Sequence, residues 1–148
     1  MTLEKTIEND VKTAMKKRDG IKVSALRLLR SEINNLRLTE SKKEITDRDV
    51  IKIIQRQIKQ RKDSIQQFQK GKRLDLAEKE KKEMEILSEY LPKQLSDDEL
   101  KEIINQTISE LGVTDKKGGG QVIKSVMEKT TGKAEGKRVS TLVFQILH

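Results

Sequence analysis

Apolar residues recur along the chain with the period of an α-helix. Near the start, Leu3, Ile7, Val11 and Ala14 are spaced three or four residues apart, so one face of a helix over residues 3–18 is apolar. The same spacing predicts six more helices: residues 21–39, 47–70, 76–90, a fifth between Ser96 and Gly112, a short one that contains Val122 and Val126, and residues 137–147. Because no segment alternates polar and apolar residues as a strand does, the sequence predicts an all-α fold.

Residues that start and stop helices mark the ends of these segments. Three pairs have the capping-box spacing, in which a Ser, Thr or Asp precedes an acidic residue by three positions: Thr46 with Asp49, Asp75 with Glu78, and Ser96 with Glu99. Gly71 and Gly112 follow apolar helical segments and predict helix stops. Three consecutive glycines at residues 118–120 predict a flexible bend.

A boundary between two units is predicted at residues 92–95, Pro-Lys-Gln-Leu. Pro92 ends the fourth helix, because proline cannot continue a helix and disfavours helical geometry in the residue before it. Charge also changes there: residues 1–95 carry 24 Lys and Arg against 16 Asp and Glu, whereas residues 96–148 carry 8 against 8. We expect a basic helical hairpin or bundle domain at residues 1–92, a small three-helix domain at residues 96–148, and a hinge at residues 92–96.

The net charge of +8 lies entirely in residues 1–95, that is, in the first of these units and the boundary after it. Residues 52–73 alone hold eight basic residues and one acid, Asp63, and Arg61 falls within the apolar stripe of its helix. A surplus of this kind favours binding to polyanions such as RNA. The alternative is a solvated surface rich in Lys and Glu.

Few residues of the sequence suit catalysis or metal binding. The only histidine is the terminal His148, and there is no cysteine, so zinc sites of the usual kind and histidine-based catalytic pairs are not expected. Glu78, Glu80, Glu83 and Glu85 lie among lysines, which predicts an exposed helix face with local ion pairs. We expect no catalytic residue, no metal and no cofactor.

Two stretches of the sequence resemble a known family. They are residues 73–100, RLDLAEKEKKEMEILSEYLPKQLSDDEL, and residues 132–147, GKAEGKRVSTLVFQIL. Both resemble the YqeY family of small bacterial cytosolic proteins, with Glu135 where that family usually has Asp. The family is similar to the C-terminal tail of the B subunit of glutamyl/aspartyl-tRNA amidotransferase, and the resemblance covers essentially the whole chain.

The resemblance implies a non-catalytic, tRNA-associated helical protein of the cytoplasm, in which residues 96–148 resemble the amidotransferase tail. The opening residues agree with that location, because they lack an apolar run fit for export or for crossing a membrane. Two other functions stay open. One is an accessory role in glutamine-dependent carbon–nitrogen ligase activity, with a protein partner in tRNA-dependent amidation; the other is a protein-interaction module.

Two clusters of cations are predicted to contact RNA phosphates. The first comprises Arg56, Lys59, Lys62, Lys72 and Arg73. The second comprises Lys133, Lys137 and Arg138, in the turn around Gly132 and Gly136. For the second cluster, a solvated turn without a ligand is the alternative.

The aromatic residues decide which kind of RNA binding the sequence predicts. There are three, Phe68, Tyr90 and Phe144, and all are expected in the core or at its boundary. Recognition of single-stranded RNA relies on exposed rings that stack on bases. Binding is therefore expected to depend on the backbone and shape of the nucleic acid, as on a folded tRNA.

Overall fold

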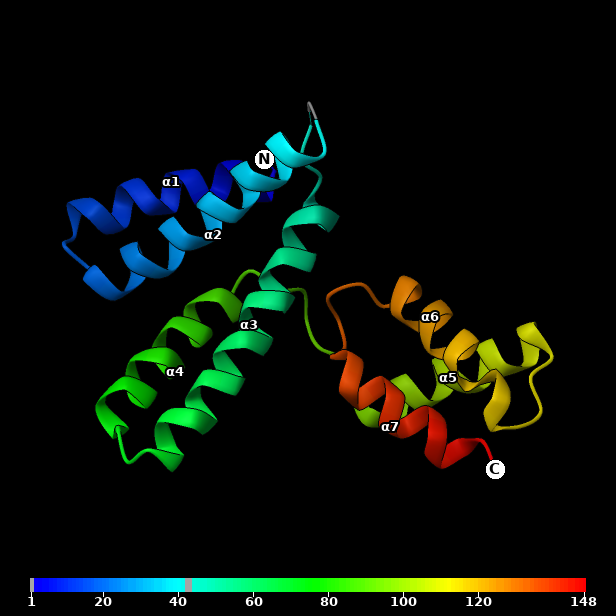
Figure 1. Ribbon diagram of the computed structural model, residues 1–148. Coiled ribbons are helices and arrows are strands. Elements are labelled where there is room, and N and C mark those ends of the chain that lie inside the picture. The colour runs from blue at the N-terminus through cyan, green and yellow to red at the C-terminus, as the bar shows by residue number, and fades with distance from the viewer. Residues whose placement is uncertain (1, 42–43) are drawn as a thin grey trace. The chain divides into compact units, whose positions relative to one another are not determined.

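The computed structural model describes residues 2–41 and 44–148. Within these residues it has seven α-helices, one short 3₁₀ helix and no strand, so the predicted all-α fold is confirmed (Figure 1). The chain divides into two compact units, Met1–Leu91 (unit 1) and Pro92–His148 (unit 2). Each unit is described by itself, and independent folding of the two stays a prediction.

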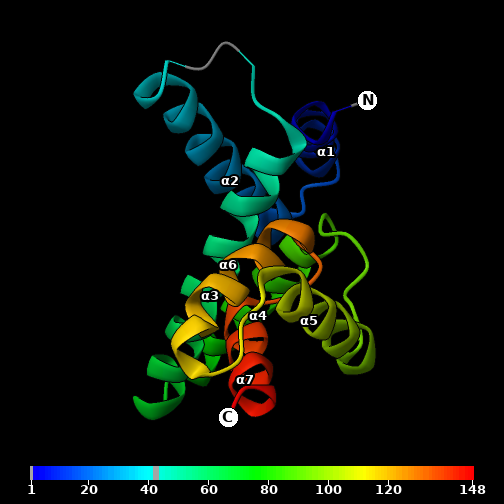
Figure 2. The same ribbon diagram turned by 90° about the vertical axis from the view of Figure 1, so that its right-hand side faces the viewer.

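Unit 1 begins with a hairpin of two helices, α1 (Leu3–Lys16) and α2 (Gly20–Thr39), which lie side by side (Figures 1 and 2). The Asp19 carboxylate accepts a hydrogen bond from the Lys22 backbone at 3.2 Å and so caps α2. Between the helices, Arg18 has a left-handed φ of 56°.

A second hairpin completes unit 1, formed by α3 (Asp47–Lys70) and α4 (Leu74–Ser88). The predicted capping box of Thr46 and Asp49 is present at the start of α3. Apolar faces of all four helices meet in one core, whose buried residues are Ile7, Val11, Leu26, Leu29, Ile33, Ile45, Val50, Ile53, Ile54 and Leu87.

Helix α3 ends at Lys70 with Gly71 as its C-cap, so the predicted stop is confirmed, but the rest of the corner between α3 and α4 differs from the prediction. Gly71 keeps a negative φ of −82°, and Lys72 takes the left-handed position with φ 57°. The Arg73 N–H donates to the Phe68 carbonyl at 2.8 Å, which completes the helix-ending motif that usually has glycine at the left-handed residue. Because the corner closes this tightly, α4 begins at Leu74, and the prediction of Asp75 as its cap is wrong.

A buried ion pair joins the two helices of this hairpin. The Arg61 guanidinium donates to the carboxylate of Glu83, and to that of Glu80 at 3.0 Å. Only 8% of the Arg61 side chain and 6% of the Glu83 side chain are exposed. The prediction that Glu83 lies on an exposed face is therefore wrong, because an arginine within the apolar stripe of α3 requires a buried counterion.

Unit 2 packs three helices around its own core: α5 (Asp97–Leu111), α6 (Gly119–Lys129) and α7 (Gly136–Ile146) (Figure 2). The predicted Ser96 capping box and the stop at Gly112, with a left-handed φ of 66°, are both confirmed. Hydrogen bonds from Ser96 hold the pKa of the Glu99 carboxyl below its usual value. The buried core residues are Leu100, Ile104, Val122, Val126, Ala134, Val139, Leu142, Val143 and Leu147.

Two of the three consecutive glycines of unit 2, Gly118 and Gly119, are tightly packed, whereas nothing lies within 4 Å of a Cβ atom added to Gly120. They span the end of a 3₁₀ helix, η1 (Lys116–Gly118), and the start of α6. A Cβ atom added to Gly118 would lie 2.4 Å from Val113 Cγ1, and one added to Gly119 would lie 2.5 Å from Phe144 Cε1. The prediction of a flexible bend is therefore wrong, because these glycines allow close approach of neighbouring side chains.

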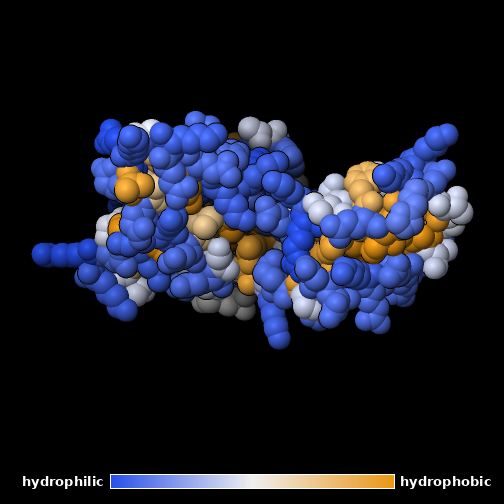
Figure 3. Space-filling view, turned by 90° about the horizontal axis from the view of Figure 1, so that it is seen from below, coloured by the Kyte–Doolittle hydropathy of each residue, from blue (hydrophilic) through white to orange (hydrophobic). Residues whose placement is uncertain are grey.

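Most of the surface seen in Figure 3 is hydrophilic, and unit 2, at the right, shows a band of hydrophobic residues on this face. Within residues 2–41 and 44–148, no helix has both the length and the apolar character needed to cross a membrane. The same part of the chain contains no group of three or more His, Cys, Asp and Glu residues arranged to hold a metal ion.

We predict that Arg61→Met lowers the free energy of unfolding by about 3–5 kcal/mol, because it leaves the Glu83 carboxylate buried without its counterion. Adding Glu83→Met should restore most of that loss, since two apolar side chains of similar volume then pack together. Urea denaturation monitored by circular dichroism measures both changes.

The control is the exposed pair of Arg73 and Asp75, whose side chains are 61% and 70% exposed. Arg73→Met should change the free energy of unfolding by less than about 1 kcal/mol. A single Arg61 variant as stable as this control would contradict the structural role of the buried pair.

Candidate nucleic-acid interface

The first predicted cation cluster lies on α3 and on the corner that follows it. Arg56, Lys59 and Lys62 are exposed on α3, and Lys72 and Arg73 are exposed at the corner. With the exposed Lys70 they form one surface, called here the basic corner. The buried Arg61 points into the hairpin and does not belong to it.

Charge is concentrated strongly at the basic corner. Apart from the buried Arg61, residues 59–73 contain five cations, all exposed, and a single acid, Asp63. Arg56 donates to Glu32 at 2.7 Å, and Arg73 lies 3.5 Å from Asp75. Both arginines are still 61–62% exposed in their side chains, so these pairs remain in water, where an ion pair contributes little and can be exchanged for a phosphate.

The exposed cations of α3 also share a direction. On a helix of 3.6 residues per turn, Lys52, Arg56, Lys59 and Lys70 fall on one face. From the first to the last, this face extends about 27 Å at 1.5 Å per residue. That length is enough for several phosphates along a nucleic-acid strand.

The second predicted cluster spans the turn between α6 and α7, residues 130–135, which holds Lys133, and the first turn of α7, which holds Lys137 and Arg138. Lys133 and Lys137 are exposed, whereas Arg138 is half-buried. Gly132 takes a left-handed φ of 78°, and the neighbouring Ala134 is fully buried. Glu135 precedes α7 without a side-chain hydrogen bond to cap it, as expected where the usual Asp is replaced by a longer side chain.

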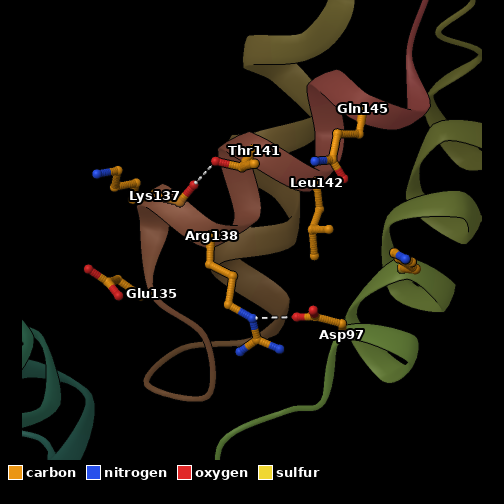
Figure 4. Close-up of a pocket in the computed structure, with 8 residues that line it drawn as sticks. Asp97, Glu135, Lys137, Arg138, Thr141, Leu142 and Gln145 are labelled. Atoms are coloured by element: carbon orange, nitrogen blue, oxygen red, sulfur yellow. Dashed lines mark hydrogen bonds and ion pairs between the residues drawn. The ribbon is translucent and has the colours of Figure 1, made fainter.

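Arg138 fastens this turn to the segment that leads into α5. Its guanidinium donates to the Leu95 carbonyl at 2.6 Å and to the Asp97 carboxylate at 2.8 Å (Figure 4). These contacts occupy part of the guanidinium's hydrogen-bonding capacity. Lys133 and Lys137 therefore extend into solvent more freely than Arg138 does.

Two further hydrogen bonds join the same segments. The Leu95 N–H donates to the Lys133 carbonyl at 2.9 Å, and the Gln94 side-chain amide donates to the Gly132 carbonyl at 2.7 Å. The two stretches that carry the family resemblance, near residues 92–97 and 132–138, thus meet inside unit 2. A single sequence gave no spacing or pattern that predicts this pairing.

A groove of about 540 Å³ lies beside this junction, between α5 and α7. Lys101, Lys137 and Arg138 line it together with the acids Asp97 and Glu135 (Figure 4). Because the charges are mixed, the groove is a weaker anion site than the basic corner. RNA binding by either predicted cluster stays a prediction.

We predict that trypsin cuts the native protein after Lys93 before it cuts inside any helix. Residues 94–97 are hydrogen-bonded into unit 2, which leaves Lys93 at the exposed edge of the predicted hinge. Arg138→Gln removes the two hydrogen bonds to Leu95 and Asp97 and should speed this cleavage roughly tenfold, since hydrogen bonds to charged groups contribute about 1.5–3 kcal/mol.

The matched control is Lys137→Gln, which also deletes one cation and one trypsin site but leaves those hydrogen bonds intact. Mass spectrometry of the early fragments gives the rate at each site. Equal rates in the two variants, or early cleavage spread evenly along the chain, would contradict the account of this junction.

Comparison with known proteins identifies the family. Residues 4–147 match the family described as Yqey-like protein. An uncharacterized protein of Schizosaccharomyces pombe is 38% identical over 94 residues, which cover 64% of this chain and 76% of the relative. Two further relatives are named altered inheritance of mitochondria protein 41, mitochondrial. The one from Pyrenophora tritici-repentis is 30% identical, over 95% of this chain and 78% of the relative. The one from Candida glabrata is 36% identical, over 58% of this chain and 48% of the relative.

The match spans only about half of the Candida glabrata relative. Two of these relatives are named as mitochondrial proteins, and a cytoplasmic location for this chain stays a prediction. The match over residues 4–147 includes both units and both stretches on which the resemblance was noted. This chain is a small helical protein that belongs to the YqeY family.

Proposed function

We propose that this protein binds folded tRNA without catalysing a reaction on it, and that the basic corner is its main contact. The cations of the corner take backbone phosphates, and Lys133 and Lys137 provide a second contact. The choice of tRNA rests on the resemblance of the family to the amidotransferase tail. The choice of the basic corner rests on this chain's own residues.

The observation that carries the proposal is the backbone conformation of Lys72. Left-handed geometry costs a residue other than glycine about 1–2 kcal/mol, yet the left-handed position at the corner holds a lysine, and the neighbouring Gly71 does not occupy it. Arg18 and Ser41 also have left-handed φ values, so the strain at Lys72 supports a functional role only together with the charge around it. At Lys72 the strain places a cation at the apex of the hairpin, beside the exposed Lys70 and Arg73.

The surroundings of the corner support recognition of phosphates. Phe68, the aromatic residue nearest in sequence, is half-buried and belongs to α3. The exposed groups are flexible lysines and arginines, which pair with phosphates without reading base identity. An interface of this kind suits a folded RNA, whose backbone presents many phosphates in a fixed shape.

We predict a salt-dependent affinity for tRNA. If about five phosphates are neutralised, a plot of log affinity against log salt concentration should have a slope of about −4 to −5, at roughly 0.9 per contact for a duplex. Changing Arg56, Lys59 and Lys62 together to Gln should weaken binding of all tRNAs alike and flatten the slope by up to about three. Filter binding measures the slope, and circular dichroism checks the fold.

Changing Lys133, Lys137 and Arg138 to Gln tests the second contact in the same assay, and its effect should be smaller because Arg138 is already bonded within unit 2. If neither set of changes alters tRNA affinity while the fold is intact, the basic corner is only a solvated surface. A protein-interaction module then becomes the better account.

A single substitution at Lys72 should change tRNA affinity and fold stability in opposite directions. Lys72→Gly should stabilise the fold by about 1 kcal/mol, because glycine adopts left-handed geometry without strain, and it should also weaken tRNA binding. Most substitutions that weaken binding also leave the fold unchanged or less stable. Opposite effects on the two properties would therefore distinguish a binding residue from a structural one.

Arg18→Gly is the matched control. Arg18 has φ 56°, follows α1 as Lys72 follows α3, and is also exposed. The hydrogen bond from Asp19 to the Ala14 carbonyl, at 3.0 Å, closes the same helix-ending motif. Arg18→Gly should give a similar gain in stability with little loss of tRNA affinity; equal losses in the two variants would mean that net charge alone drives binding.

A further inference from the structure

The exposed face of α7 combines a cation with an aromatic ring. Lys137 and Phe144 are seven residues apart, which is close to two full turns, so they lie on the same face of the helix with Thr141 between them. All three are exposed, as is Gln145 beside them. The sequence of α7 contains no acidic residue, and the acids that share the groove with Lys137 are Asp97 and Glu135, which lie outside the helix.

Phe144 stands out among the aromatic residues of the chain. Its exposed fraction is 42%, whereas Phe68 and Tyr90 are half-buried, and the Tyr90 hydroxyl donates to Asp10. The expectation that all three rings lie in or at the core is therefore wrong for Phe144. Val139 and Val143 fill the core side of α7, and Phe144 lies one residue further round the helix.

The ring is held in place although it is exposed. A Cβ atom on Gly119 would lie 2.5 Å from its Cε1 atom and 2.8 Å from its Cζ atom, so the ring rests on the backbone at the start of α6. Only glycine permits this contact. A ring fixed on one side and open to solvent on the other is already oriented to stack on a planar group, and binding costs it little conformational freedom.

Positive charge lies on the same side of unit 2. Lys116 and Lys117 are exposed in η1. They precede Gly119, against which the Phe144 ring rests, by three and two residues. One acid accompanies them, Asp115, whose carboxylate accepts a hydrogen bond from the Lys117 backbone at 3.0 Å. The ring therefore has cations near it both along α7 and across in η1.

We propose that Phe144 stacks on an unpaired base of RNA while Lys137 contacts a phosphate of the same strand. This inference rests on the proposed function and adds that unit 2 recognises single-stranded parts of the folded RNA. The two residues are about 10.5 Å apart along the helix axis, a distance that a short stretch of extended strand spans. Thr141 and Gln145 lie between and beside them as hydrogen-bonding groups.

The combination of an exposed ring with exposed lysines at residues 116, 117 and 137 favours RNA over a protein partner as the occupant of this face. A protein that docks on an exposed ring usually supplies apolar or acidic surroundings, and its binding does not require unpaired bases. Base stacking on an aromatic side chain, by contrast, tolerates any base and is combined with cations that follow the strand. The α7 face has both of these features.

The experiment uses Phe144→Trp in the full chain, which otherwise contains no tryptophan. Its fluorescence is followed during titration with an RNA stem-loop and with a blunt RNA duplex that has the same number of phosphates. Stacking should quench the fluorescence with the stem-loop and leave it nearly unchanged with the duplex. The control is Leu38→Trp, since Leu38 on α2 is 77% exposed and far from α7 in sequence; its fluorescence should respond to neither RNA.

Affinity provides an independent measure. Phe144→Leu keeps an apolar side chain but removes the ring, and should weaken stem-loop binding roughly five- to hundredfold, the range for loss of one base stack, while duplex binding stays the same. Lys137→Gln should weaken binding to both RNAs. Circular dichroism of each variant shows whether the contact with Gly119 can be changed without loss of the fold.

The outcomes separate this inference from the proposed function. If both RNAs bind with salt-dependent affinity but neither quenching nor the Phe144→Leu variant distinguishes them, phosphate binding stands and the stacking inference is overturned. If neither RNA binds the wild-type chain, the proposed function fails and the inference fails with it. Quenching by the stem-loop with selective loss in Phe144→Leu supports both.

Discussion

The buried ion pair between Arg61 and Glu83 is the contact on which the far half of the α3–α4 hairpin depends. The main core of unit 1 takes in α3 only as far as Ile54, with Ile58 packed against it. Beyond that point the buried residues of the two helices are Ile65, Ala77 and the two members of the ion pair. Such a pair is weak evidence for high stability but is costly to break, and it fixes which faces of α3 and α4 meet.

That constraint has a direct consequence for the surface. Because Arg61 and Glu83 must face each other, the remaining cations of α3 are turned outward, and Lys72 is carried to the apex of the hairpin. The strained geometry of Lys72 and the excess of positive charge then coincide at one place. A chain with few apolar residues thus uses a buried charge pair to orient an exposed basic surface.

Much of the fold could be predicted from the sequence, because helical periodicity and capping residues are local signals. Thr46, Ser96 and Gly112 act as their spacing predicts. The errors involve contacts between distant segments: Glu83 is buried by Arg61, and Gly118 and Gly119 are packed by Val113 and Phe144. No local pattern specifies such partners. The cations of the candidate site were visible in the sequence, but the backbone strain of Lys72, the bonds of Arg138 and the exposed ring of Phe144 required the structure.

The most direct test of the central claim is lysine reactivity of the full chain with and without tRNA, measured residue by residue by mass spectrometry. The account predicts that tRNA protects Lys59, Lys70 and Lys72 most strongly and Lys133 and Lys137 to a lesser degree. Lys12 and Lys16, on α1, should remain as reactive as in the free protein. Equal protection of all lysines, or protection that omits the basic corner, would contradict the claim that this corner is where the nucleic acid binds.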